Sequence, residues 1–235
     1  MIKKNLMCKT LITCFIFFIC SFMQSYANDY ERTEAELYKE AVKLFDQKKY
    51  KQAIRAFQKI EDLYPLSYGA MKAGLLSSVS HYNMGDYASA ASNADGYIQT
   101  YPNGEDLPYV YYLRILSYYM QIHKVQLEQQ TAYKTLDLAT EYINLFPNSI
   151  YTEKVKRKIK LVTEHILAKE YSIGRFYLRR GEYLAAIKRF QNVISNKDSS
   201  YSPKSISYLI TAHLALGLDL EVQQYENLLA ENPKK

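Results

Sequence analysis

The sequence predicts an all-α fold, an α-solenoid of about five tetratricopeptide-type helical hairpins, on three observations. A polar turn, a tyrosine, a small residue and a further apolar residue recur at fixed offsets in RRGEYLAAIKRFQNVI, DQKKYKQAIRAFQKI and NMGDYASAASNADGYI. Apolar residues follow a helical period near 3.6 along most of the chain, and no segment alternates convincingly with period two. Three regions close on an aromatic residue followed by proline, which stops helices.

The spacing of these prolines sets the length of the repeat. Pro102 follows Pro65 by 37 residues and Pro147 follows Pro102 by 45, near the period of about 34 residues in tetratricopeptide repeats. The longer spacing indicates an insertion in the third hairpin. At equivalent places, the three copies of the pattern carry Tyr50, Ala53 and Phe57; Tyr87, Ala90 and Ala94; and Tyr183, Ala186 and Phe190.

The repeat pattern predicts a domain over residues 34–235, with hairpins at 34–65, 71–102, 109–147, 167–198 and 203–233. Ala41, Ser78 and Gly174 occupy the small position of three first helices, where a small side chain lets paired helices approach closely. Because one hairpin cannot bury its apolar face alone, neighbours should stack and leave a concave groove lined by first helices. The segment 150–166 is expected to extend the helical run between the third and fourth hairpins.

The first 27 residues predict a secretory signal peptide. Three lysines precede the apolar run TLITCFIFFICSFM, and the tripeptide SYA ending at Ala27 resembles a small-x-small cleavage site. The alternative is a membrane anchor, but an anchor needs about 20 apolar residues, and this run is shorter. We therefore expect export, a mature N-terminus at Asn28 and a short polar linker over residues 28–33.

The composition of this leader limits the chemistry of the mature protein. All three cysteines, Cys8, Cys14 and Cys20, lie within the leader, so its removal would leave no disulfide. Loss of the three leader lysines lowers the formal net charge from +6 to +3. We therefore expect packing rather than cross-links to stabilise the protein, and no nucleic-acid partner.

No motif predicts catalysis, a cofactor or a metal site. The four histidines are far apart in sequence, and there is no His-Glu-x-x-His or Cys-x-x-Cys pair. Phosphate-binding, dinucleotide-binding and nucleophile-elbow motifs are also absent from the sequence. The basic run EKVKRKIK at residues 153–160 favours a solvated face of an amphipathic helix, with an anionic lipid or acidic partner as the alternative.

The expected groove combines aromatic, apolar and cationic side chains. Such a lining suits an extended peptide with aromatic side chains and a carboxylate, because guanidinium groups pair with the anion. Most of the other tyrosines we assign to packing, since a tyrosine ring can be buried while its hydroxyl reaches water. The residues that the repeat register directs to the groove are Tyr38, Leu75, Val79, Tyr82, Arg114, Tyr171, Arg175 and Arg179.

Two longer segments, DLPYVYYLRILSYYM at 106–120 and FPNSIYTEKVKRKIKLVTEHILAKEYSIGRFYLRRGEYLAAIKRF at 146–190, resemble the BamD/ComL family of outer-membrane assembly factors. The resemblance extends over nearly all of the mature chain. It implies a non-enzymatic periplasmic scaffold at the inner leaflet of the outer membrane, which works with the barrel protein BamA to fold and insert β-barrel proteins.

The resemblance also implies roles for particular residues. N-terminal repeats of the family recognise the C-terminal signal of unfolded barrel substrates, which assigns Tyr38, Leu75, Val79, Tyr82 and Arg114 to a substrate-peptide groove. The family's C-terminal repeats dock a POTRA domain of BamA, which assigns Arg175, Arg179 and Arg189 to a partner interface.

Arg189 aligns with a family arginine implicated in coupling to BamA. The repeat pattern places it one residue before the buried Phe190, at the edge of the apolar stripe and facing a neighbouring surface. We expect Arg189→Glu to weaken partner binding and to leave stability nearly unchanged.

The sequence leaves alternatives open for both membrane attachment and function. Family members carry a lipid on a cysteine after the leader, and Cys20 is the candidate, although Ile19 precedes it where a small residue is usual; Cys14 fits equally imperfectly. The protein is therefore either lipidated at Cys20 or cut after Ala27 and held at the membrane through its partner. The alternative functions are another envelope scaffold, for pilus assembly or cell-wall coordination, and a regulatory solenoid of a hydrolase.

Overall fold

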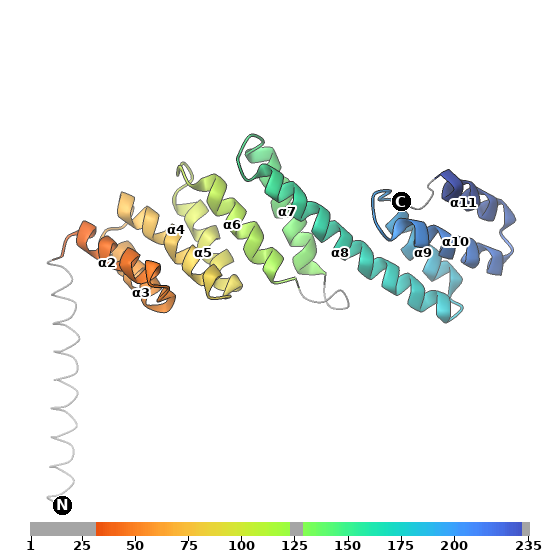
Figure 1. The fold of residues 1–235 in the computed structure, drawn as a ribbon, viewed down its shortest axis with the longest axis horizontal. Helices are drawn as coiled ribbons and strands as arrows, with labels where there is room; N and C mark the ends of the chain where they lie inside the picture. The colour runs from red at the N-terminus through yellow and green to blue at the C-terminus, as the bar shows by residue number, and fades with distance from the viewer. Residues whose placement is uncertain (1–31, 123–128, 232–235) are drawn as a thin grey trace, which may run out of the picture. The chain divides into compact units, whose positions relative to one another are not determined.

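The computed structural model describes residues 32–122 and 129–231, and within these ranges the chain forms ten α-helices and no strand (Figure 1). The expected all-α fold class is confirmed. The predicted signal peptide, Cys20, most of the linker and part of the third hairpin's loop lie outside the described residues. The helices group into two compact units, one ending at Gly104 and one beginning at Glu105.

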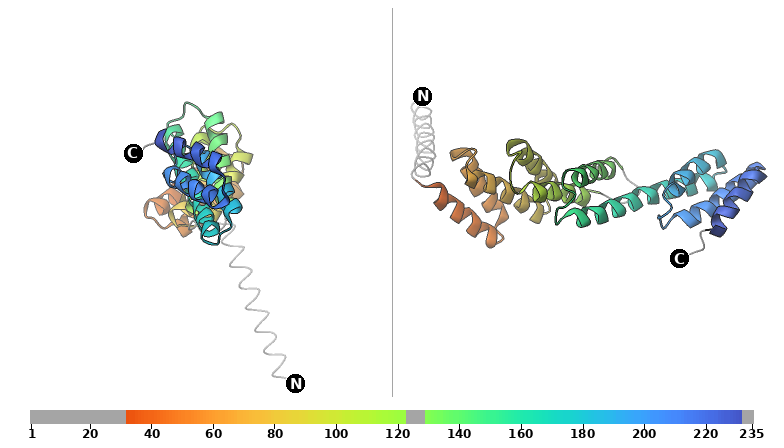
Figure 2. Two further views of the ribbon diagram at one scale, coloured as in Figure 1. Left: turned by 90° about the vertical axis from the view of Figure 1, so that its right-hand side faces the viewer. Right: turned by 90° about the horizontal axis from the view of Figure 1, so that it is seen from above.

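The first unit holds α2 (Glu34–Asp46), α3 (Tyr50–Leu63), α4 (Tyr68–Asn83) and α5 (Tyr87–Thr100). The second unit holds α6 (Leu107–Met120), α7 (Gln130–Leu145), α8 (Thr152–Arg179), α9 (Tyr183–Ile194), α10 (Ser202–Leu216) and α11 (Asp219–Glu231). Within each unit every helix packs on the next one along the chain (Figures 1 and 2). In addition, α2 contacts α4, and α8 contacts both α6 and α10. This nearest-neighbour stacking is the packing of a tetratricopeptide-type solenoid.

The repeated sequence pattern marks the buried stripe of the second helix in three hairpins. Its small and apolar positions are all fully buried, whereas the tyrosines that begin the stripe are half-buried. The small position of the first helix is buried as well, at Ala41, Ser78 and Gly174. The residues of the stripe are Ala53, Phe57, Ala90, Ala94, Ala186 and Phe190.

The turns inside the hairpins share one backbone device. Gly85, Gly181 and Gly217 have φ angles of 79°, 75° and 68°, and Lys48 takes the same place in the first hairpin with φ 58°. In each turn, the amide of the next residue donates to the carbonyl five residues before it, as Lys49 does to Leu44 at 3.0 Å. This is the closing bond of a Schellman motif, which favours glycine because a left-handed residue without Cβ has no steric penalty.

The aromatic–proline pairs end three second helices in the same way. Tyr64, Tyr101 and Phe146 follow the last helical residue with nearly identical backbone angles, φ from −124° to −130° and ψ from 56° to 63°. A following proline excludes the α region for the residue before it. The expectation that these prolines stop the helices is confirmed.

The longest helix, α8, runs without a break through the expected start of the fourth hairpin at Leu167 (Figures 1 and 2). Its N-terminal half packs on α7 through Val155 and Val162, and its C-terminal half packs on α9 around Gly174. Apolar residues keep helical spacing across Leu167, so α8 has a continuous apolar side along both halves. One helix therefore belongs to two neighbouring hairpins.

Lys48→Gly should stabilise the protein. A left-handed conformation costs an L-residue roughly 1–2 kcal/mol in the folded state, and glycine removes this strain. Glycine also raises the conformational entropy of the unfolded chain, which offsets part of the gain. We therefore expect the free energy of unfolding to rise by roughly 0.5–1 kcal/mol. The matched control is Gly181→Ala, whose added Cβ would meet no atom within 4 Å. It should lose a similar amount for the backbone reason alone. A lower urea midpoint for Lys48→Gly would contradict this account of the turn.

Gly174→Leu should destabilise the fourth hairpin. A Cβ placed on Gly174 would lie 2.8 Å from Cε1 of the fully buried Phe190, so the ring or a helix must move, at a cost of about 1–3 kcal/mol. The matched control is Gly96→Leu, because Gly96 is also helical but a Cβ added there would meet no atom within 4 Å. Equal urea midpoints for the two leucine variants would show that the contact is not tight.

Candidate protein-interaction surfaces

Four of the five residues predicted for the substrate groove lie on the first helices of the first unit. Leu75, Val79 and Tyr82 are spaced by four and three residues and so share one side of α4, and Tyr38 lies on α2, which contacts α4. Tyr38, Val79 and Tyr82 are half-buried, whereas Leu75 is only 8% exposed. The ring of Tyr82 packs edge-on against Tyr87, with centroids 5.3 Å apart. Leu75 is therefore largely inaccessible to a bound peptide, unlike Tyr38, Val79 and Tyr82.

Arg114, the fifth predicted groove residue, lies on α6 in the second unit and is buried. Its Nη2 donates to Oε2 of Glu141 on α7 at 2.9 Å, and its guanidinium stands 4.5 Å from the centroid of the Tyr111 ring. Only 9% of the arginine side chain is exposed. The guanidinium is therefore engaged between two helices of its own hairpin, and pairing with a peptide carboxylate would require this ion pair to open.

Two residues assigned to the partner interface are exposed on the C-terminal half of α8. Arg175 and Arg179 face solvent, and Arg175 stands 5.7 Å from the ring of Tyr171. Phe176, between them, is 47% exposed, and Leu184 on α9 is 73% exposed. Exposed arginine and aromatic side chains are enriched in protein–protein interfaces. We call the surface formed by Arg175, Phe176 and Arg179 on α8 the arginine face.

Arg189, the third residue assigned to the partner, makes an ion pair within the chain. Its Nη1 donates to both carboxylate oxygens of Glu170 on α8, at 3.0 and 3.2 Å, and Asn192 donates to the same carboxylate at 2.9 Å. The Glu170 side chain is 10% exposed and the Arg189 side chain 37%. The neighbouring surface that Arg189 faces is thus α8 of its own hairpin. Arg189→Glu would place two carboxylates together, so we expect this variant to lower stability as well as partner binding.

The sequence did not predict either ion pair, nor the exposed apolar side chains of Phe176 and Leu184. Glu141 and Glu170 lie 27 and 19 residues from their arginines, and no local pattern reports which charges meet across two helices. Phe176 and Leu184 could have been found, because each places a large apolar side chain outside the buried helical stripe.

His81 and Asp86 hold the turn between α4 and α5. His81 Nδ1 lies 3.0 Å from Oδ2 of Asp86, and Asp86 caps α5 by accepting from the amide of Ser89. Hydrogen bonding from the Ser89 side chain, and next from its amide, holds the pKa of the Asp86 carboxyl below the usual range. In this part of the chain, no group of three or more His, Cys, Asp or Glu side chains is placed to hold a metal ion. No helix in the described ranges combines the length and apolarity needed to cross a lipid bilayer.

Breaking the Arg189–Glu170 pair should destabilise the protein. Arg189→Ala leaves a nearly buried carboxylate that still accepts from Asn192 but has lost its cation, which should cost about 1–3 kcal/mol. Adding Glu170→Gln should recover part of that loss, because the unpaired buried charge is removed. The control is Arg180→Ala, since Arg180 pairs with Glu182 while 61% exposed and should cost less than about 1 kcal/mol. Additive losses in the double variant would contradict coupling between the two residues.

Stacked tetratricopeptide-type hairpins define the class of helical repeat proteins, whose neighbouring repeats together form extended surfaces. The family model described as "YfiO: Outer membrane lipoprotein" matches residues 30–228. The chain therefore belongs to the YfiO/BamD family of outer membrane lipoproteins.

Three relatives illustrate this membership, and each bears the name "Outer membrane protein assembly factor BamD". The protein from Rickettsia prowazekii is 36% identical over 88% of this chain and 82% of its own length. The one from Caulobacter vibrioides is 31% identical over 86% of this chain and 67% of its own. The one from Neisseria meningitidis serogroup A is 26% identical over 77% and 72%.

Two solved structures are similar at lower identity. The MamA protein is 17% identical, with 84% of this chain and 90% of that chain covered and a TM-score of 0.38. The TPR2AB domain of yeast Sti1 in complex with an Hsp90 peptide is 13% identical, with 84% and 76% covered and a TM-score of 0.46.

Proposed function

We propose that this protein is a non-enzymatic scaffold subunit of the machinery that assembles β-barrel proteins in the outer membrane. The observation that carries the proposal is the family match over most of the chain, together with relatives that are named outer membrane protein assembly factors. In this role the protein binds unfolded barrel substrates and a BamA-like barrel subunit. It acts on the periplasmic side of the outer membrane, attached through a lipid on Cys20 or through its partner.

The α2–α4 surface of the first unit is the proposed substrate site. Its partly exposed Tyr38, Val79 and Tyr82 offer ring faces and an aliphatic surface to the aromatic side chains of an extended peptide. Leu75 forms the floor beneath them. Because Arg114 is already paired with Glu141, recognition rests mainly on apolar contact and less on the peptide carboxylate.

The arginine face of the second unit is the proposed docking surface for a POTRA domain of the BamA-like subunit. Arg175 and Arg179 are exposed there beside Phe176, so a partner can bury an aromatic ring and pair with two guanidinium groups in one contact. Arg189 supports this surface indirectly, because its bond to Glu170 fixes α9 against α8.

Substrate binding can be tested with a fluorescent peptide that copies the last ten residues of a barrel protein and ends in phenylalanine. Tyr38→Ala and Tyr82→Ala together should weaken its binding to the full chain by about 1–3 kcal/mol, that is by about five- to a hundredfold, because each ring loses its contact. The control is Tyr133→Ala, since Tyr133 is 50% exposed on a second helix and should leave affinity unchanged. Equal affinities for the double variant and the unmutated chain would remove this surface from the proposed function.

A further inference from the structure

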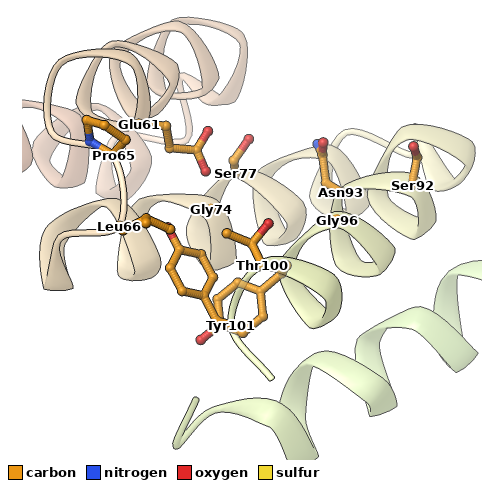
Figure 3. Close-up of a pocket in the computed structure, with 11 residues that line it drawn as sticks. Glu61, Pro65, Leu66, Gly74, Ser77, Ser92, Asn93, Gly96, Thr100 and Tyr101 are labelled. Carbon is orange, nitrogen blue, oxygen red and sulfur yellow. The ribbon is translucent and has the colours of Figure 1, made fainter. Parts of the chain in front are cut away.

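The first unit contains a cavity on a side of α4 that the proposed substrate site does not use. It has a volume of about 310 Å³ and opens to solvent between α3, α4 and α5 (Figure 3). Gly74 and Ser77 line it, whereas Leu75, Val79 and Tyr82 lie on a different side of the helix at 100° per residue. The lining residues are Glu61, Pro65, Leu66, Gly74, Ser77, Ser92, Asn93, Gly96, Tyr97, Thr100 and Tyr101.

The single charged side chain of this lining is the carboxylate of Glu61, on α3. Figure 3 shows it turned toward Ser77 and Gly74, and a Cβ on Gly74 would lie 2.6 Å from its Oε1, so a larger residue there would displace the carboxylate. Within the described residues no cationic side chain pairs with Glu61. The cavity therefore presents a partly desolvated anion whose counter-charge the described part of the chain does not supply.

The raised pKa of Glu61 is consistent with a carboxylate that is partly buried and has no cationic partner among the described residues. Burial raises the pKa of Glu61 to about 6, and the neighbouring charge of Asp62 adds to the shift. From α5 and its C-cap the titratable lining groups are the hydroxyls of Tyr97 and Tyr101, and burial with the nearby Glu61 charge raises the pKa of Tyr101. From α4 the lining residues, Gly74 and Ser77, carry no titratable group. A cation entering the cavity would relieve the cost of ionising Glu61.

The remaining walls combine an aromatic ring, polar side chains and an apolar rim. Tyr101 is half-buried, with its ring 5.1 Å from that of Tyr97. Ser92, Asn93 and Thr100 add hydrogen-bonding groups from α5. At the rim, Leu66 is 73% exposed and has a φ of 64°, a left-handed conformation that turns its side chain into solvent beside Pro65.

These features together select for an arginine side chain. A guanidinium pairs with a carboxylate through two parallel hydrogen bonds and stacks on an aromatic face, while its aliphatic stem covers apolar surface. A lysine could also contact the ring, but it lacks the planar guanidinium that pairs with a carboxylate through two parallel hydrogen bonds. An anionic group would be repelled by Glu61. The volume lies at the lower limit of the roughly 300–1,000 Å³ typical of small-ligand pockets, which suits one inserted side chain better than a folded segment.

We propose that this cavity, the Glu61 pocket, is a docking site for an arginine side chain presented by a partner protein, with Glu61 pairing with the guanidinium and Tyr101 stacking on it. The site goes beyond the proposed function for two reasons. It lies on a side of α4 that the proposed substrate site does not use, and it binds a cation, whereas the substrate site would bind aromatic rings. The two proposals can therefore fail separately.

The test titrates the full chain with the peptide acetyl-Gly-Arg-Gly-amide and follows the backbone amide signals of Gly74 and Gly96 by nuclear magnetic resonance. The matched peptide contains citrulline, which keeps the shape of arginine and removes its charge. We expect saturable shifts with the arginine peptide at millimolar concentration and at least about fivefold weaker binding of the citrulline peptide. No shift of either signal, or equal binding of both peptides, would overturn the proposal.

Three single variants test whether the guanidinium binds at Glu61. Glu61→Gln should weaken the arginine peptide to the level of the citrulline peptide, and Gly74→Ala should weaken it severalfold because the added Cβ displaces the carboxylate. Asp62→Asn removes an equal charge one residue away, outside the cavity, and should change affinity by less than about twofold. Equal effects of Glu61→Gln and Asp62→Asn would mean that the peptide responds to overall charge alone and would overturn the site.

The affinity for the arginine peptide should fall as the pH is lowered. With a pKa near 6, Glu61 is ionised at pH 7.5 and mostly protonated at pH 5, so the affinity of the unmutated chain for the arginine peptide should fall roughly tenfold between these values. In Glu61→Gln the affinity should not change over this range. A pH-independent affinity in the unmutated chain would contradict ion pairing with Glu61.

Discussion

The close approach of two helices at a small residue is the contact on which the rest of this structure depends. In the fourth hairpin, Gly174 lets α8 come so near α9 that a Cβ would overlap the Phe190 ring. In the first hairpin, the fully buried Ala41 and Phe57 belong to one core cluster. Since a two-layer hairpin has little interior, its stability depends on bringing the second helix's apolar stripe against such small residues. The turns and proline stops keep the helices in the register that this contact needs.

Sequence periodicity predicted where this contact lies, because the repeat pattern marks the small position of the first helix and the apolar stripe of the second. The same offsets that mark Tyr183, Ala186 and Phe190 also fix the turn before them, and glycine at Gly181 follows from a left-handed backbone. Tyr64, Tyr101 and Phe146 end their helices because the next residue is proline in each case. Each of these features depends on a few neighbouring residues, so one sequence suffices to predict it.

Features that join distant residues were beyond the sequence. The expectation for Arg189 named the edge of the helix correctly but not Glu170, which neutralises it from another helix. Arg114 was expected at the groove surface and is instead buried against Glu141. The Glu61 pocket also escaped prediction, because α3 supplies its charge while α4 and α5 supply the glycines that open it. Each of these features becomes visible only once the helices are packed.

The α2–α4 surface, the Glu61 pocket and the arginine face present different chemistry to partners. The first offers tyrosine rings, the second a carboxylate, and the third guanidinium groups beside an exposed phenylalanine. In the proposed scaffold role such differences would give specificity, since a segment suited to one surface is disfavoured at another by charge.

The central functional claim is that this chain works beside an outer-membrane barrel protein. The most direct measurement is mass spectrometry of the proteins retained by the tagged full-length chain after mild detergent extraction from the membranes of its own cells. We expect an outer-membrane barrel protein with periplasmic POTRA domains to be retained in near-equal amount, and Arg175→Glu with Arg179→Glu to reduce its recovery strongly. Recovery of the tagged chain with no barrel protein, under conditions that preserve other membrane complexes, would contradict the account.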